Sequence, residues 1–170
     1  MNDVSPRKKA SRALFGCLTI TAIGLLTLGV IAFIRRGALP PLTRQQWEEG
    51  KQRWKAADIS SYRIRIRVSG RQAAEYRAEV IDGRVSAAWR NDAPLKQQRT
   101  LSTWSVPGMF ATVAGDLRNL EKWSNGQADA ATPRPWVRVF FHPQYGYPQR
   151  YYRSERGVDV SWEVLEFESF

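Results

Sequence analysis

The chain of 170 residues contains one cysteine, Cys17, and one histidine, His142. A lone cysteine excludes a disulfide within the chain, so cysteine content does not indicate the redox compartment. A zinc site built from cysteine and histidine needs several ligands, and Cys17 lies in a predicted membrane segment, out of reach of His142 as a catalytic partner. The sequence also lacks a glycine-rich phosphate-binding loop. We therefore predict no metal site, no bound cofactor and no catalytic residue, and we interpret His142 as structural.

Carboxylate chemistry is the enzyme alternative that remains. Asp159 and Glu163 share one face of a predicted strand, and a glycosidase-like use of two acids needs a cleft that the sequence does not define. A three-residue turn in the last hairpin would place Arg153 opposite Asp159, which is an ordinary ion pair. A hydrolytic enzyme that uses carboxylates and tyrosines is therefore kept as an alternative.

The excess of positive charge is smaller than the total suggests. The net charge is +10, but residues 1–36 hold six Lys/Arg and one Asp, and residues 37–170 hold twenty Lys/Arg and fifteen Asp/Glu, so each part carries +5. The charges close to the predicted membrane segment suit anionic lipid headgroups. The Arg-rich strand lacks the interleaved aromatic residues of a single-stranded nucleic-acid platform. We therefore expect no nucleic-acid partner.

One long hydrophobic run stands out in this otherwise polar sequence. Residues 13–34 are 22 uncharged, mostly aliphatic residues between a basic tail (1–12) and the pair Arg35 and Arg36. A bilayer core needs about 20 residues at a rise of about 1.5 Å, and only a helix pairs its own backbone there. A signal peptide would have a shorter apolar region and a cleavage site of small residues. The run therefore predicts one transmembrane helix.

The orientation of this helix follows from the flanking charges. Four Lys/Arg precede the run, and Arg35, Arg36 and Arg44 follow it. The positive-inside rule therefore slightly favours a cytoplasmic N-terminus and a C-terminal domain outside the cytoplasm. Residues 35–42 with Pro40 and Pro41 predict a short stiff connector, because proline after proline favours an extended chain.

The region 43–170 begins with a predicted helix and a strand hairpin. Thr43 with Gln46 matches a capping box, and Trp47 and Trp54 fall on one face of a helix over 43–57. Strict alternation predicts strands over 62–68 and 74–80, and Asp82 followed by Gly83 predicts a tight turn into a third strand over 84–89. That turn would pair Val80 with Val85, Ala78 with Ala87 and Tyr76 with Trp89, with every apolar residue on one face.

The first two strands carry an arginine stripe that has two interpretations. The register that keeps all apolar side chains on one face pairs Val68 with Ala74, Ile66 with Tyr76 and Ile64 with Ala78. Arg67 would then face Glu75, Arg63 would face Glu79, and Arg65 would face the like-charged Arg77. The stripe is interpreted as a solvated sheet face with two cross-strand ion pairs. The alternative is an anion-binding face centred on Arg65 and Arg77.

The second half of the region repeats the pattern of a helix followed by strands. Residues 91–103 predict a loop that runs partly alongside the sheet, and Ser105 and Pro107 mark the start of a helix that ends near Trp123. Strands are predicted over 136–141, 149–155 and 158–167, with a bulge near Val164 and Leu165 where the apolar parity changes. The predicted fold class is α+β: after the transmembrane helix, a single domain of order α-βββ-α-βββ, with an antiparallel sheet packed on two helices.

Several of these segments together carry a family resemblance. The helix with Trp47 and Trp54 is followed by the segments 61–64 (Ser-Tyr-Arg-Ile) and 82–85 (Asp-Gly-Arg-Val), then by a short helix and the run 141–148, which ends in Tyr-Gly-Tyr-Pro. Over about residues 43–170 the chain resembles a bacterial family of uncharacterised membrane-anchored or lipoprotein extracytoplasmic domains. The resemblance implies a domain outside the cytoplasm and no known activity. Many members have cysteines after the first strand, and this chain has none.

The Tyr-Gly-Tyr-Pro loop also has two interpretations. Gly146 suits a backbone with positive φ, and Pro148 fixes how the chain enters the next strand, either trans or cis. The functional alternative is an aromatic binding surface for a peptide, glycan or protein, since tyrosines give large contact area at low entropic cost. Its residues would be Tyr145, Tyr147, Tyr151 and Tyr152.

The sequence thus predicts a single-pass membrane protein of unknown specific role. Its expected partners are the lipid bilayer, through residues 13–34, and a membrane or envelope protein. Its expected role is binding or scaffolding at the outer face of a bacterial cytoplasmic membrane. An accessory subunit of a larger membrane complex is the main alternative.

Overall fold

The computed structural model describes residues 39–71, 73–96 and 101–170. The predicted basic tail, transmembrane helix and first part of the connector (1–38) lie outside these residues. Within them, no helix has both the length and the apolar character needed to span a bilayer. Residues 39–170 form one compact unit.

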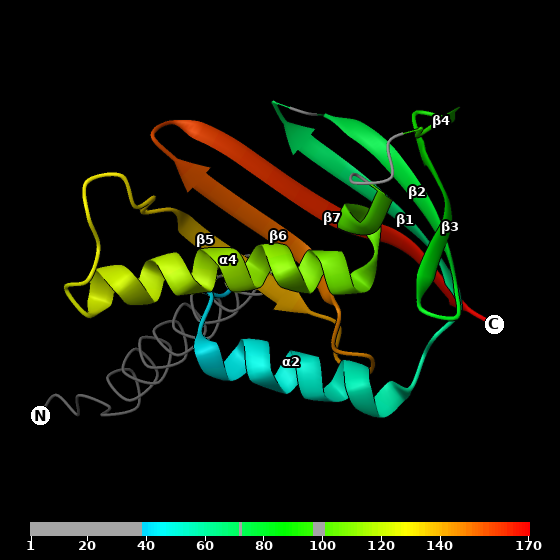
Figure 1. The fold of residues 1–170 in the computed structure, drawn as a ribbon, viewed down its shortest axis with the longest axis horizontal. Helices are drawn as coiled ribbons and strands as arrows, with labels where there is room; N and C mark the ends of the chain where they lie inside the picture. The colour runs from blue at the N-terminus through cyan, green and yellow to red at the C-terminus, as the bar shows by residue number, and fades with distance from the viewer. Residues whose placement is uncertain (1–38, 72, 97–100) are drawn as a thin grey trace, which may run out of the picture. The chain divides into compact units, whose positions relative to one another are not determined.

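This unit is an α+β domain with an antiparallel sheet of seven strands in the order β4-β3-β2-β1-β7-β6-β5. Both helices lie on the same side of the sheet (Figure 1). The central pair joins β1 to β7, so the two ends of the domain's sequence meet in the middle of the sheet. The elements are α2 (Arg44–Ala57), β1 (Tyr62–Gly70), β2 (Ala74–Ile81), β3 (Arg84–Arg90), β4 (Ala93–Pro94), η1 (Ser102–Trp104), α4 (Val106–Ser124), β5 (Trp136–Phe141), β6 (Pro148–Glu155) and β7 (Val158–Ser169).

The predicted order of helices and strands is confirmed, with two additions. The segment predicted as a loop contains the two-residue strand β4, which pairs with β3, and the short 3-10 helix η1. Neither has a periodic pattern, because both are too short to show one. Trp104 at the end of η1 stacks on Tyr76 with ring centroids 3.6 Å apart, which attaches this segment to the sheet.

Helix starts agree with the capping signals. In α2, the Thr43 hydroxyl accepts from the backbone N–H of Gln46, and the Gln46 side chain accepts from the N–H of Thr43, both at 3.2 Å. The Ser105 hydroxyl accepts from the N–H of Gly108 at the start of α4. Each cap supplies a partner to N–H groups that have none within the helix.

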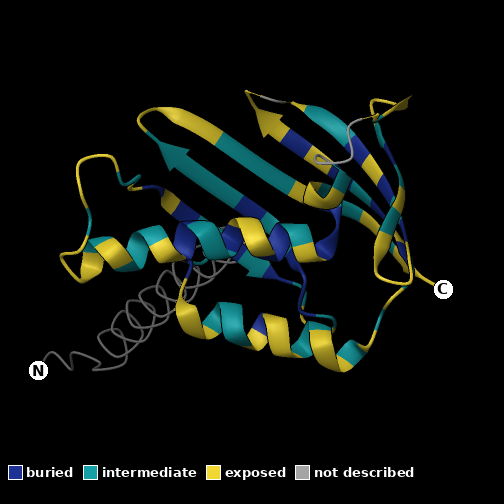
Figure 2. Ribbon diagram, viewed as in Figure 1, coloured by how far each residue is buried: buried dark blue, intermediate teal, exposed yellow. Residues whose placement is uncertain are grey.

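The core lies between the sheet and the helices, where Figure 2 shows most of the buried residues. Tyr62, Ile64, Ile66 and Val68 of β1 are all at most 5% exposed, as their alternation predicts. Helix α4 contributes Val106, Met109, Phe110, Val113 and Leu117 from one face. The opposite face of the sheet carries no helix among the described residues, and we call it the outer face.

The predicted register of β1 with β2 is confirmed at each position, including Arg65 opposite Arg77. The predicted bulge in β7 is confirmed as well, because Arg65 pairs with Glu166 and Ile66 with Val164, so that Leu165 has no partner. The bulge turns Phe167 back toward the helices, where its ring lies 5.2 Å from that of Tyr62.

The predicted register of β2 with β3 is correct only at Val80 opposite Val85. A second bulge, at Ser86, pairs Ala78 with Ala88 and Arg77 with Trp89. Trp89 therefore lies on the outer face, contrary to the prediction that it joins the core. In the last hairpin the turn has two residues, not three, so Ser154 rather than Arg153 lies opposite Asp159.

The described part of the connector, residues 39–42, runs along the free edge of β5. The N–H of Leu42 donates to the Val137 carbonyl, and the N–H of Val139 donates to the Pro40 carbonyl, both at 3.1 Å. Leu42 is 7% exposed and belongs to the core. The chain thus enters the domain as an extended segment beside β5.

Candidate functional site

The outer face of β2, β1 and β7 carries alternating arginines and glutamates. Arg63 lies 3.3 Å from Glu79 and 3.7 Å from Glu168. Arg65 forms ion pairs with Glu75 at 3.3 Å and with Glu166. Strand alternation sends these side chains away from the helices, and the antiparallel register sets acids beside bases.

Arg65 and Arg77 carry the same charge and lie opposite each other, and each forms an ion pair with a different carboxylate. Arg77 pairs with Asp92 at 2.9 Å, beyond the end of β3. The hydrogen bond to Glu166 raises the pKa of Arg65 above its usual value, so the guanidinium stays charged. Of the two predicted ion pairs, Arg63 with Glu79 is formed, whereas Glu75 pairs with Arg65 instead of Arg67.

Trp89 adds an aromatic ring to this charged face. The Arg77 guanidinium carbon lies 5.3 Å from the ring centroid of Trp89, a cation–π distance. The bulge at Ser86 places the two residues opposite each other. Sequence reasoning missed this site residue, because a bulge leaves no signal in a strand as short as β3, which has seven residues.

These side chains line an open hollow of about 790 Å³ on the outer face. Leu165, the residue of the β7 bulge, also lines the hollow and is half-buried. The charged and aromatic residues that line the hollow are Arg63, Arg65, Arg77, Glu79, Trp89, Glu166, Phe167 and Glu168. With three arginines and three glutamates, its charges balance.

A smaller hollow of about 210 Å³ lies on the helix side of the sheet, between η1, α4 and the strands β1 and β7. Trp104, Met109 and Trp162 form much of its wall, and none of its residues is charged. It continues the apolar core and offers a charged ligand no partner.

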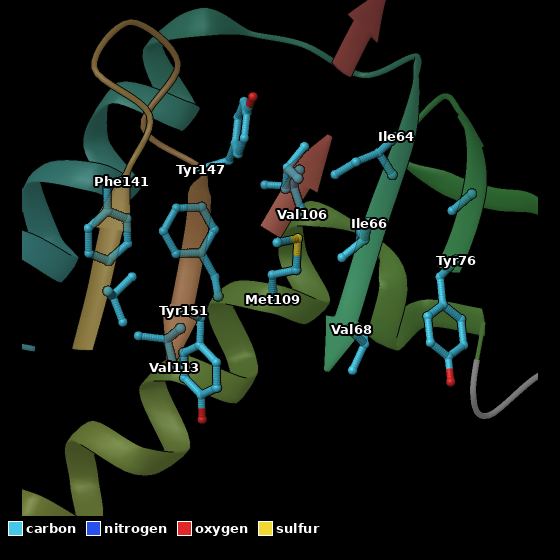
Figure 3. Close-up of a cluster of buried hydrophobic side chains, with 14 of the residues drawn as sticks. Ile64, Ile66, Val68, Tyr76, Val106, Met109, Val113, Phe141, Tyr147 and Tyr151 are labelled. Atoms are coloured by element: carbon cyan, nitrogen blue, oxygen red, sulfur yellow. The ribbon is translucent and has the colours of Figure 1, made fainter. Parts of the chain in front are cut away.

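The four tyrosines proposed from the sequence do not form one surface. Tyr147 and Tyr151 are 3% and 2% exposed and point into the core, as Figure 3 shows. Tyr145 is half-buried against Phe167, with ring centroids 5.7 Å apart. Tyr152 lies on the outer face of β6, edge-on to Trp136. The prediction of a shared aromatic surface is wrong for Tyr147 and Tyr151, because strand alternation and the loop turn them inward.

The Tyr-Gly-Tyr-Pro loop has instead a packing role. His142 stacks on Tyr145 and on Tyr147, with ring centroids 5.2 and 4.8 Å apart, and its Nδ1 accepts from the Tyr145 backbone N–H. Burial lowers the pKa of His142 and raises the pKa of Tyr147 to about 12. Gly146 has φ 76°, as predicted, and no described peptide bond, including that of Pro148, is cis.

A buried polar network lies between α4 and β6. The Tyr151 hydroxyl donates to Asp116 Oδ2 at 2.5 Å, and Arg153 Nε donates to Asp116 Oδ1 at 3.1 Å. Arg153 also pairs with Glu155. Burial, with the charge of Asp116 as a smaller cause, raises the pKa of Tyr151, so the tyrosine stays protonated and acts as a donor. The signal in the sequence was Asp116 itself, a charged residue next to Leu117 on the apolar face of α4.

The Asp116 network attaches α4 to the sheet, whereas the hollow on the outer face is open to a ligand. Asp116 is 7% exposed, and both of its carboxylate oxygens already accept hydrogen bonds, so it anchors the helix to the sheet. Among the residues that the structure describes, no three acids, histidines or cysteines group so as to hold a metal ion. The hollow is open and lined by side chains that donate, accept and stack, which suits ligand binding.

Comparison with known proteins adds no family assignment. No family model matches the chain, and no curated protein matches it either.

Proposed function

We propose that the protein is a membrane-anchored binding domain that holds a protein or envelope component in the hollow of its outer face. The uncharged run 13–34 supports the anchor. The observation that carries the binding role is the hollow itself, an open concavity of about 790 Å³ on the side of the sheet opposite α2 and α4. The resemblance to bacterial extracytoplasmic domains supports a location outside the cytoplasm.

The charges of the hollow favour a ligand that carries both signs. Each arginine already has a carboxylate within 4.0 Å, namely Glu79 for Arg63, Glu75 for Arg65 and Asp92 for Arg77. A polyanion would have to displace these acids, whereas a polypeptide segment with acidic and basic residues can exchange ion pairs with them. Trp89 supplies the flat apolar contact that anchors such segments.

The enzyme alternative receives less support from this geometry. Three glutamates border the hollow, and each is engaged by arginine: Glu79 and Glu168 by Arg63, and Glu166 by Arg65. An acid held as an ion pair is poorly suited to donate a proton, as hydrolysis of a glycosidic bond requires. We therefore propose binding rather than hydrolysis.

Site-specific photocrosslinking of the full-length chain in cells tests this proposal. A photoreactive phenylalanine analogue replaces Trp89, and a matched variant carries it at Gln52, an exposed residue of α2 on the other side of the domain. We expect a discrete crosslinked product from position 89 that is absent from position 52. In a variant that carries the crosslinker at Leu165, the substitution Arg77→Gln should reduce the yield of the crosslinked product.

Two results would contradict the proposal. The first is the absence of a product at position 89 when the protein is correctly inserted. The second is an identical product pattern at positions 89 and 52, which would show random contact rather than use of the hollow.

A further inference from the structure

A second region of the outer face, on β5 and β6, differs in composition from the hollow. Cross-strand pairing sets Trp136 opposite Ser154, Arg138 opposite Tyr152 and Phe140 opposite Arg150. These pairs carry aromatic rings and arginines and no acid. We call the five larger residues the arginine–aromatic patch: Trp136, Arg138, Phe140, Arg150 and Tyr152.

The rings and guanidinium groups of this patch contact one another. The Arg138 guanidinium carbon lies 4.3 Å from the Trp136 ring centroid, and that of Arg150 lies 5.0 Å from the Phe140 centroid. Trp136 is nevertheless 54% exposed, one of the largest exposed apolar side chains described. The patch thus offers apolar rings with positive charge placed directly on them.

The two arginines of the patch are not neutralised as those of the hollow are. Within the described residues neither Arg138 nor Arg150 has an acid within 4.0 Å, although Glu163 of β7 lies opposite Arg150 in register. Arg138 instead donates to the backbone carbonyl of Leu39 at 2.5 Å. The acids nearest in register, Asp159 and Glu163, lie on β7 and border the patch on one side only.

The patch lies where the chain enters the domain. Leu39 is the first described residue, and Pro41 pairs with Arg138 at the β5 edge. Residue 34, the last of the predicted transmembrane helix, is five residues before Leu39, and five residues span at most about 17 Å. The patch therefore lies beside the first described residues, which follow the predicted span closely in the sequence.

Together these observations match the chemistry of a membrane surface. Tryptophan and tyrosine accumulate at the headgroup level of bilayers, and arginines attract anionic headgroups. We infer that the arginine–aromatic patch docks on the anionic lipid headgroups of the membrane in which the protein is anchored. This inference rests on the anchor in the proposed function, and it leaves the hollow, on the other half of the sheet, free for its ligand.

Docking on lipid can be measured with the full-length chain in nanodiscs. Cys17→Ala removes the native thiol, and a single cysteine for a fluorophore is placed at Ser154, beside Trp136 in the patch. The matched control has it at Ser86, an exposed residue of β3 near the other end of the sheet. Nanodiscs contain either phosphatidylcholine alone or phosphatidylcholine with phosphatidylglycerol, and in both a headgroup-attached spin label acts as the quencher.

We expect stronger quenching at Ser154 than at Ser86, with a larger difference in the anionic nanodiscs. The variant Arg138→Gln/Arg150→Gln should reduce quenching at Ser154, because two basic residues near an anionic surface shift the docking equilibrium roughly 30-fold. Raising the salt concentration should act in the same direction by screening.

Three outcomes would overturn the inference. One is equal quenching at Ser154 and Ser86. Another is quenching at Ser154 that changes neither with the anionic lipid nor with the two arginine substitutions. Such quenching would result from the membrane anchor alone. The third comes from a further arm of the assay in native membrane vesicles: quenching at Ser154 there, with none in the anionic nanodiscs, would assign the patch to a protein partner.

The same experiment shows separately whether the predicted membrane anchor is wrong. A chain without a membrane span would not co-elute with the nanodiscs, and the quenching assay would not begin. A patch that fails to dock in nanodiscs that do contain the protein overturns the docking alone. Crosslinking at Trp89 remains a separate measure of the hollow.

Discussion

Gly50 of α2 and Gly146 of the Tyr-Gly-Tyr-Pro loop pack backbone against backbone. A Cβ on Gly146 would lie 2.2 Å from the Gly50 carbonyl oxygen, and a Cβ on Gly50 would lie 2.6 Å from the Phe141 ring and 2.9 Å from the Gly146 oxygen. A glycine weakens a helix, so Gly50 looks unfavourable in the sequence. The contact with Gly146 explains its presence, because only two glycines permit this approach.

The substitution Gly50→Ala should therefore destabilise the domain by about 1–3 kcal/mol, since the gain in helix propensity is smaller than the cost of overpacking. Gly115→Ala in α4 is the matched control. The nearest atom to its added Cβ is 3.9 Å away, at the end of the Arg118 side chain. It should stabilise the domain by up to about 1 kcal/mol. Urea unfolding of the full chain in detergent, followed by tryptophan fluorescence, gives both values. Equal effects at the two positions would contradict the packing argument.

Tyr62→Phe should cost about 1–3 kcal/mol of unfolding free energy, because it leaves a buried donor without an acceptor. The Tyr62 hydroxyl accepts from the backbone N–H of Val106 at 2.9 Å, in the first turn of α4, and burial raises its pKa to about 12. Tyr152→Phe is the control, because Tyr152 lies on the outer face and should respond by less. The same unfolding measurement compares them, and a loss at Tyr152 as large as that at Tyr62 would rule out the proposed cause.

Stability should fall as the pH is lowered from 7 toward 5, through His142. Its pKa is lowered by burial, so the folded state binds a proton less readily than the unfolded chain does. The loss therefore begins near the unfolded value of about 6.5 and is complete below the folded pKa. His142→Asn does not titrate, yet its side-chain oxygen retains an acceptor for the Tyr145 N–H. Unfolding free energies at several pH values should show a flatter profile for this variant in that window. An unchanged profile would assign the pH dependence to other groups.

Asp116 and Tyr151 should be energetically coupled. A double-mutant cycle of Asp116→Ala and Tyr151→Phe isolates their interaction, which for two residues in one hydrogen-bond network is about 0.5–3 kcal/mol. Because the hydrogen bond is 2.5 Å long and both side chains are buried, we expect a coupling energy above zero. Strict additivity of the two substitutions in urea unfolding would argue against a shared role in attaching α4.

Arg77→Gln should leave stability within about 1 kcal/mol, because ion pairs at exposed residues contribute little. The Arg77 and Asp92 side chains are 49% and 87% exposed. This small effect makes the hollow suitable for binding tests, since a loss of crosslinking at this face would then reflect recognition and not unfolding. A large fall in the urea midpoint would instead give Arg77 a structural role.

Local patterns predicted most of the elements correctly. The alternation of Ile64, Ile66 and Val68 with arginines determined both the strand and its register with β2, because a slip of one residue would bury charges. The cap at Thr43 likewise marked the start of α2. These features depend on neighbours in the chain, so the sequence alone contains them.

The candidate site depended on longer-range contacts. The bulge at Ser86 moved Trp89 to the outer face, and strand alternation with the loop turned Tyr147 and Tyr151 into the core. A bulge adds one unpaired residue to a strand, and packing across the sheet decides where it forms. The sequence by itself determined the anchor prediction, the fold class and the charged stripe. Only the tertiary structure decided which face is open, which aromatic residues reach it, and that residues 39–42 join the sheet at β5, because these depend on contacts between segments far apart in the chain.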